Sequence, residues 1–216
     1  MDITSIVFLS IILCISIGLH EYAHALVSYK LGDPTPKLQG RLTPNPLAHL
    51  DPIGFLMIFL IGFGRGKPVQ INPNYYKKPV QWELLVALAW PATNIALAIF
   101  AILIILIYAA ITGMRQTEVL VGMSDVVIHF WSLFAFINIA LAVFNMLPIP
   151  PLDWFRLIKT FAPRLWWYMQ KYSLYISIFF LILILGPGRW AIGWFIRSIS
   201  QYIFTLLYTL LSVIFY

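Results

Sequence analysis

Hydrophobic residues are grouped into long runs separated by short polar or proline-containing stretches. A helix needs about 20 consecutive apolar residues to cross the roughly 30 Å hydrocarbon core of a bilayer. Four runs reach this length and a fifth is shorter, so the pattern predicts five membrane-spanning helices. Their ranges are 3–31, 82–111, 126–147, 172–185 and 190–216.

A shorter apolar run, residues 53–63, follows Pro52 and ends in a glycine-rich stretch. Eleven helical residues cover only about 16 Å, so this run is expected to dip into the membrane and return, or to pack against the bundle. The sequence shows no internal repeat and no linker. We therefore expect one domain over residues 1–216, an all-α polytopic membrane protein with about five to six transmembrane helices and one short re-entrant segment.

Composition and charge agree with this class. The chain is 61% hydrophobic and 10% charged, whereas soluble domains average about 25% charged residues. Cytoplasmic loops of membrane proteins carry the excess of Lys and Arg. With the N-terminus outside, 11 of the 14 basic residues are cytoplasmic, namely Lys30, Lys37, Arg41, Arg65, Lys67, Lys77, Lys78, Arg156, Lys159, Arg164 and Lys171. Topology thus explains the net charge of +6, and no nucleic-acid partner is expected.

The string His20-Glu21-Tyr22-Ala23-His24 places three ionisable side chains in the first apolar run. On a helix, His20 and His24 lie one turn apart on one face, where they can share a zinc ion, and Glu21 can activate a water molecule. Hydrogen bonding at a helix end is the simpler alternative. However, ionisable groups at membrane depth are costly without a metal or dedicated partners. The motif therefore predicts a zinc metallopeptidase that acts inside a membrane.

Catalytic zinc usually takes three protein ligands, so one more residue is needed. The candidates are Asp33, His49, Asp51, Asp125, His129 and Asp153. Asp125 and His129 begin a span on the outer side in this topology, too far from a site in the cytoplasmic half, and Asp125 is expected to cap that helix. Asp153 is the better candidate, because three preceding prolines hold the backbone extended at the cytoplasmic border of the membrane.

These motifs, in this order, resemble the site-2 protease family of intramembrane zinc metallopeptidases. The similarity extends from about residue 15 to 157 and includes the segments 20–24, 31–36, 40–54, 67–69, 72–73 and 145–153. The proline-rich stretches resemble the compact bacterial-type branch without a PDZ domain. The resemblance implies a prokaryotic cell membrane, and the distribution of basic residues predicts an active site toward its cytoplasmic side.

Carried over residue by residue, the resemblance implies one Zn²⁺ per chain, held by His20, His24 and Asp153, with Glu21 as the catalytic base. It implies substrates that are transmembrane helices of other proteins, which must unwind locally in the lipid bilayer. Residues 37–79 match the family's strand-like, membrane-associated region, which could clamp an extended substrate by strand addition. The sequence does not reveal the oligomeric state.

Two further residues are candidate substrate contacts. Asn94 lies where the family carries an asparagine that contacts substrate or stabilises the oxyanion, and a helix–helix hydrogen bond is the alternative. His49 is a candidate substrate contact or auxiliary ligand, or else a loop histidine bonded to Asp51 or to the backbone.

Two tryptophans depart from the family pattern, which has glycine at both places. Trp154 follows Asp153, and Trp90 precedes the proline of the Asn94 motif. An indole beside Asp153 adds about 200 Å² of rigid surface, so we expect Trp154 to line the cleft and restrict substrate access. The alternative function is therefore a catalytically impaired zinc-binding pseudoprotease that binds transmembrane partners. A metal transporter would need more intramembrane carboxylates and histidines than this chain has.

Overall fold

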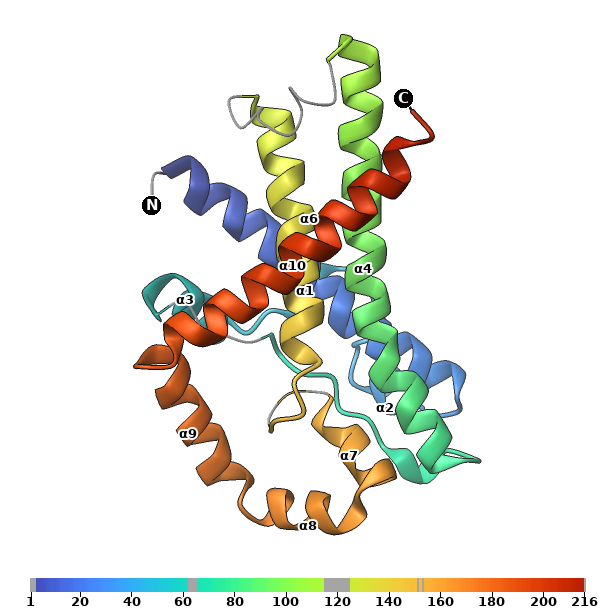
Figure 1. The fold of residues 1–216 in the computed structure, drawn as a ribbon. Coiled ribbons are helices and arrows are strands. Elements are labelled where there is room, and N and C mark those ends of the chain that lie inside the picture. The colour runs from blue at the N-terminus through green and yellow to red at the C-terminus, as the bar shows by residue number, and fades with distance from the viewer. Residues whose placement is uncertain (1–2, 62–65, 115–124, 151, 153, 216) are drawn as a thin grey trace.

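The computed structural model describes residues 3–61, 66–114, 125–150, 152 and 154–215, and Figure 1 shows their arrangement. Three long helices form its centre: α1 (Ile3–Lys30), α4 (Pro79–Thr112) and α6 (Val126–Asn145). Helix α6 packs along α4, and α1 packs against both. Each of the three is long and apolar enough to cross a membrane. We call these three helices the bundle.

Short elements connect α1 to α4: α2 (Thr35–Leu38), η1 (Pro46–His49), α3 (Pro52–Ile61) and η2 (Pro73–Tyr75). The ten residues of α3 agree with the prediction of a segment too short to span. The strand-like region expected over residues 37–79 is not found, because the part of it that the structure describes contains no strand. Prolines explain the difference, since they lack the backbone donor of a strand ladder and instead occupy the first or second position of all four short helices.

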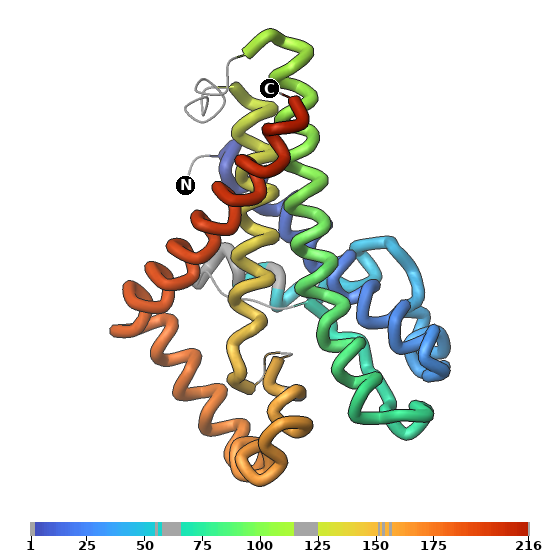
Figure 2. Tube along the Cα trace, turned by 45° about the vertical axis from the view of Figure 1, so that its right-hand side comes forward, coloured from blue at the N-terminus to red at the C-terminus, as the bar shows by residue number. Residues whose placement is uncertain are grey.

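Beyond α6 the chain turns away from the bundle through α7 (Phe155–Phe161), α8 (Pro163–Lys171) and α9 (Ser173–Leu185). Figure 1 shows these three helices as a curve below the bundle, and Figure 2 shows the same curve from another side. We call them the arch. Helix α10 (Arg189–Ser212) then returns and packs against α6 and α4.

The described residues contain three candidate spans, or four if α8 and α9, which meet at 77°, form one broken span. The expectation of five to six is therefore too high. Helix α9 has only 13 residues, about 20 Å of helix. Helix α10 is long enough, but polar residues such as Arg197 and Gln201 are distributed along it and lower its hydropathy.

Small residues bring the bundle helices close together. Four fully buried alanines, Ala98, Ala101, Ala109 and Ala135, lie in the core that α4 and α6 share, and such residues allow close helix approach in membranes. Gly18 does the same between α1 and η1, because a Cβ there would lie 2.5 Å from the Cα of Pro46. Helix α1 therefore packs closely against three other parts of the chain, namely α4, α6 and η1.

Candidate active site

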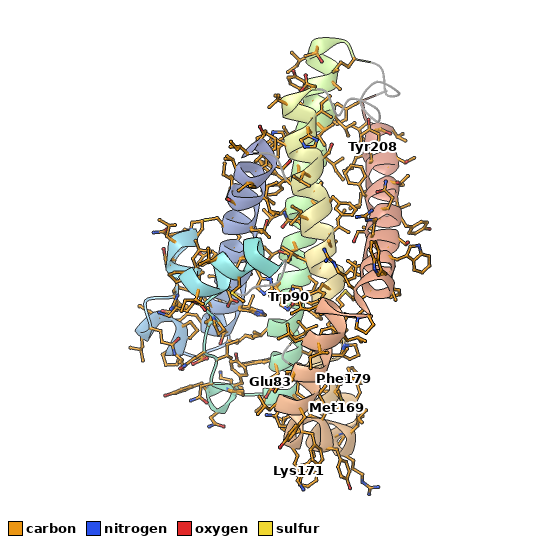
Figure 3. The ribbon with its side chains drawn as sticks, turned by 90° about the vertical axis from the view of Figure 1, so that its left-hand side faces the viewer. Glu83, Trp90, Met169, Lys171, Phe179 and Tyr208 are labelled. Carbon is orange, nitrogen blue, oxygen red and sulfur yellow. The ribbon has the colours of Figure 1, made fainter. Side chains whose placement is uncertain are left out.

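The two motif histidines lie on the buried face of α1, with His20 9% and His24 6% exposed. Their ring centroids are 5.1 Å apart and their planes are almost perpendicular. The indole of Trp90 on α4 covers both rings, at 4.7 Å from His20 and 6.4 Å from His24 between centroids. Figure 3 shows Trp90 inside the bundle, and its side chain is fully buried. The pair thus lies in a buried site with an aromatic wall.

A hydrogen bond fixes the tautomer of His24. Its Nδ1 lies 3.1 Å from the carbonyl oxygen of Val86 on α4, and a carbonyl can only accept, so Nδ1 carries the proton and donates. In a neutral imidazole Nε2 is then the nitrogen with the lone pair. A histidine that donates one ring N–H to a backbone carbonyl and presents the other nitrogen has the usual arrangement of a metal ligand.

Glu21 is held by a segment that crosses α1. The backbone N–H of Val69 donates to Glu21 Oε2 at 2.9 Å. Gly66 makes this crossing possible, because a Cβ there would lie 2.5 Å from Ile17 Cγ2 and 3.8 Å from Glu21 Cγ. The backbone N–H of Lys67 donates to the His49 carbonyl at 2.7 Å, which ties the segment to η1. The orientation of the Glu21 carboxylate is therefore set by backbone from outside the motif.

The third predicted ligand, Asp153, lies outside the described residues. Within the described ranges no group of three His, Cys, Asp or Glu side chains is arranged to hold a metal ion. Asp125 caps α6 as expected, since its carboxylate accepts from Val127 N at 2.8 Å and Ile128 N at 3.1 Å. It also accepts from the hydroxyl of Tyr108 at 3.0 Å.

Asp33 organises the chain beyond the end of α1. Its carboxylate is fully buried and accepts from Ser28 Oγ at 2.8 Å, Thr35 N at 2.9 Å and Asn72 N at 2.8 Å. Burial alone raises the pKa of Asp33, but the hydrogen bonds outweigh it and hold the pKa below its usual value. Ser28 also bonds the hydroxyl of Tyr76 at 2.6 Å. Asp33 thus fastens the 72–76 segment to the helix that carries the histidines.

His49 is fully buried on η1, and its Nε2 donates to the carbonyl of Thr43 at 2.9 Å. Its Nδ1 is buried with no hydrogen-bond partner among the described residues. Burial lowers the pKa of His49, and the positive charge of Arg41 lowers it further, although the bond to Thr43 opposes both. Asp51 accepts from Ile53 N at 3.2 Å. The ring of His49 is therefore engaged with its own loop.

The two remaining candidate residues, Asn94 and Trp154, lie on different parts of the fold. Asn94 is fully buried one turn beyond Trp90, and neither its amide nitrogen nor its oxygen has a hydrogen-bond partner in the described part of the chain. Asn138 on α6, by contrast, donates to Ser16 Oγ at 2.9 Å. Trp154 lies half-buried directly before α7.

One cavity borders His24 and a second borders the arch. The first, of about 30 Å³, is lined by His24, Val86, Ala87, Glu83, Pro73, Ile71 and Tyr76. The second, of about 560 Å³, also has Pro73 and Glu83 in its wall and is otherwise formed by the arch and the segment before it. Trp154 lines neither of these two cavities. The shared wall residues make the two spaces neighbours.

Two contacts of this site could not have been found from side-chain patterns. The carbonyl of Val86 and the N–H of Val69 are backbone groups of ordinary apolar residues. Trp90 gave a signal, because a tryptophan stands where the family has glycine, but the sequence did not place it on the histidines.

Comparison with known proteins shows consistent similarity. The family model described as "Peptidase family M50" matches residues 8–184. Over 83% of its length the chain is 40% identical to the "Putative zinc metalloprotease YwhC" of Bacillus subtilis, 81% of which is covered. It is 29% identical over 84% of its length to the "Putative zinc metalloprotease Rip2" of Mycobacterium tuberculosis, 67% of which is covered. No solved structure matches the chain.

Proposed function

Because the chain belongs to peptidase family M50, the site-2 proteases, we propose that it is a zinc-dependent intramembrane metalloendopeptidase. Its substrates would be membrane proteins, cleaved within or near a transmembrane helix. The observation that carries this proposal is the buried histidine pair on a membrane-length helix, with Glu21 adjacent and the tautomer of His24 fixed for metal binding. The same residues in a soluble, exposed setting would carry much less weight.

The donor set fits zinc. Two neutral imidazoles with a carboxylate form one of the ligand sets that catalytic zinc uses, so His20, His24 and Asp153 would hold the ion. Bound zinc supplies Lewis acidity toward the scissile carbonyl and the attacking water. The bond from Val69 N–H keeps Glu21 oriented beside the histidines. Glu21 would accept a proton from the attacking water and return it to the leaving amine.

Water can be supplied from the arch side. A buried water needs about 10–15 Å³ of such space, so the cavity of about 30 Å³ against His24 has room for about two waters. Its neighbour of about 560 Å³ lies toward the arch. Among the candidate substrate contacts, Asn94 offers a buried donor and acceptor one turn from Trp90. We also propose His49 and Trp154 as substrate contacts, and fewer observations support them.

The decisive experiment is cleavage of a panel of single-span proteins by purified protein in liposomes. Wild type should cut at least one of them and contain about one zinc per chain. Glu21→Gln should keep zinc and lose turnover, since the amide preserves shape but cannot accept a proton. His24→Ala and Asp153→Ala should lose zinc. Zinc retention without cleavage of any panel member would contradict the protease proposal, and full zinc retention in Asp153→Ala would remove that ligand.

We also propose that the N-terminus lies outside a prokaryotic cell membrane and that the site faces the cytoplasm, because this orientation puts most basic residues inside. Single cysteines at positions 37 and 77, in a Cys14→Ser background, should both react with an impermeant thiol reagent from the cytoplasmic side only. Labelling from opposite sides would mean that the segment containing α3 crosses the membrane.

A further inference from the structure

The larger cavity combines apolar and polar walls in a way that suits an extended polypeptide. Apolar surface comes from Leu152, Phe155, Trp166 and Leu174, while Gln170, Ser173 and Ser177 supply donors and acceptors. An extended backbone needs hydrogen-bonding groups along its length, and its side chains need pockets on alternating sides. The volume of about 560 Å³ is also within the range of about 300–1,000 Å³ that ligand sites occupy.

Specific contacts hold the walls of this cavity together. Lys159 on α7 donates to Glu83 on α4 at 3.3 Å, and its ammonium lies 5.7 Å from the ring centre of Trp166 on α8. Ser177 on α9 donates to the carbonyl of Pro150 at 3.1 Å. Helices α7, α8 and α9 are thus each tied to another wall, and Figure 3 shows Glu83 on α4 at the level of the arch. The cavity is a built space between the bundle and the arch.

The larger cavity lies next to the candidate active site. It shares Pro73 and Glu83 with the small cavity against His24, and Leu152 in its wall immediately precedes Asp153 in the sequence. A peptide that extends from the histidine pair toward the arch would reach this space past Pro73 and Glu83, which border both cavities. The arch segment also carries four of the basic residues assigned to the cytoplasmic side, so this end of the protein lies at the aqueous border.

Resting on the proposed function, we infer that the larger cavity binds the extended segment of substrate that flanks the scissile bond on the cytoplasmic side. The transmembrane part of a substrate would lie in lipid until it unwinds, while its juxtamembrane residues occupy the cavity. Recognition would then depend on the flanking sequence as well as on the helix that is cut.

The test is disulfide cross-linking with a single-span protein that wild type cleaves. The enzyme carries Cys14→Ser, Glu21→Gln and either Ser173→Cys in the cavity or Ile182→Cys, which lies on the same helix, outside the cavity wall and 60% exposed. Single cysteines are scanned through the juxtamembrane residues of the substrate. We expect alternate substrate positions to cross-link to residue 173 at least about fivefold more than to residue 182. If residue 173 cross-links no more than residue 182, or not at all, the inference is wrong. Cleavage of the same substrate by wild type would still support the proposed function.

A second measurement uses active enzyme. Ser173→Trp should fill the cavity and raise KM several-fold with kcat and zinc content unchanged, because it removes binding outside the reacting centre. Ile182→Trp is the control and should change neither constant. An unchanged KM in Ser173→Trp, with the tryptophan variant folded, would also contradict the inference.

Discussion

The bundle and the arch use apolar residues in opposite ways. The bundle buries small and branched side chains such as Ala98, Ala101, Ile102 and Ile139 against one another. The arch exposes large ones, with Tyr175 69%, Phe179 65% and Ile182 60% exposed, which is typical of surfaces that contact lipid or another protein. The groups proposed for chemistry lie where the packing is tight. The space proposed for substrate lies between the bundle and the arch, where a cavity of about 560 Å³ remains.

The largest expected effect tests whether the bundle positions the histidines. Trp90→Gly should weaken binding of Co²⁺, used as a spectroscopic substitute for zinc, by about 10- to 100-fold, as expected when a residue that orients a metal ligand is removed. Trp90→Phe keeps a ring on His20 and should recover most of the affinity and the visible absorption bands.

Trp131→Phe on α6, which packs against Phe100, Phe130 and Phe134, is the matched control and should leave Co²⁺ binding unchanged. Equal Co²⁺ affinity in wild type and Trp90→Gly would show that the indole is packing only.

The next effect concerns the close approach of α1 and η1. Gly18→Ala puts a Cβ 2.5 Å from Pro46 Cα, and such overpacking costs roughly 1–3 kcal/mol, against a helix-propensity gain of about 1 kcal/mol. Thermal unfolding in detergent should show net destabilisation. Gly193→Ala in α10, where nothing lies within 4 Å, should stabilise instead, and a gain at both sites would mean that η1 moves away without penalty.

A pH effect follows from His49. Its pKa is lowered in the folded protein by burial and by Arg41, so below the unfolded value of about 6.5 the unfolded chain binds more protons. Stability should therefore be constant above about pH 6.5 and fall by up to about 1.4 kcal/mol per pH unit below it. Unfolding of His49→Gln should lack this component, and identical acid profiles for the two proteins would exclude His49 as its source.

The smallest effect is expected at the contact between bundle and arch. Lys159→Met should change stability by no more than about 1 kcal/mol, because Lys159 is half exposed and such ion pairs contribute little. Glu83→Gln should behave alike. A loss above about 3 kcal/mol, measured by unfolding, would show that the arch is as tightly integrated as the bundle.

The sequence predicts the bundle well and the rest poorly, for physical reasons. Long apolar runs and the Asp125 cap locate α4 and α6, because length and capping are local properties. The sequence analysis predicts a span at α10 from the length of its apolar run, although polar residues gather on one face of this helix more strongly than on the bundle helices. No strand is found in the described part of the predicted β-like region, where prolines take part in short helices instead.

The sequence likewise predicts some features of the candidate site and not others. The spacing of His20 and His24 puts two rings on one face, and the structure places them 5.1 Å apart between centroids. Asp33 was only a possible ligand in the sequence, whereas its partners Ser28, Thr35 and Asn72 come together only in the folded chain. The roles proposed for Asp153 and Glu21 stay predictions until metal content and cleavage are measured.

The distribution of the site along the chain has a consequence for biosynthesis. Both histidines and Glu21 lie on α1, whereas Val69, Val86 and Trp90, which contact them, come later in the sequence and are therefore synthesised later. Domains are completed from the N-terminus during synthesis. A nascent chain therefore contains the helix with the histidine pair before it contains the helix whose groups contact those rings. The bond from His24 to Val86 and the packing of Trp90 on both rings can form only once α4 lies against α1.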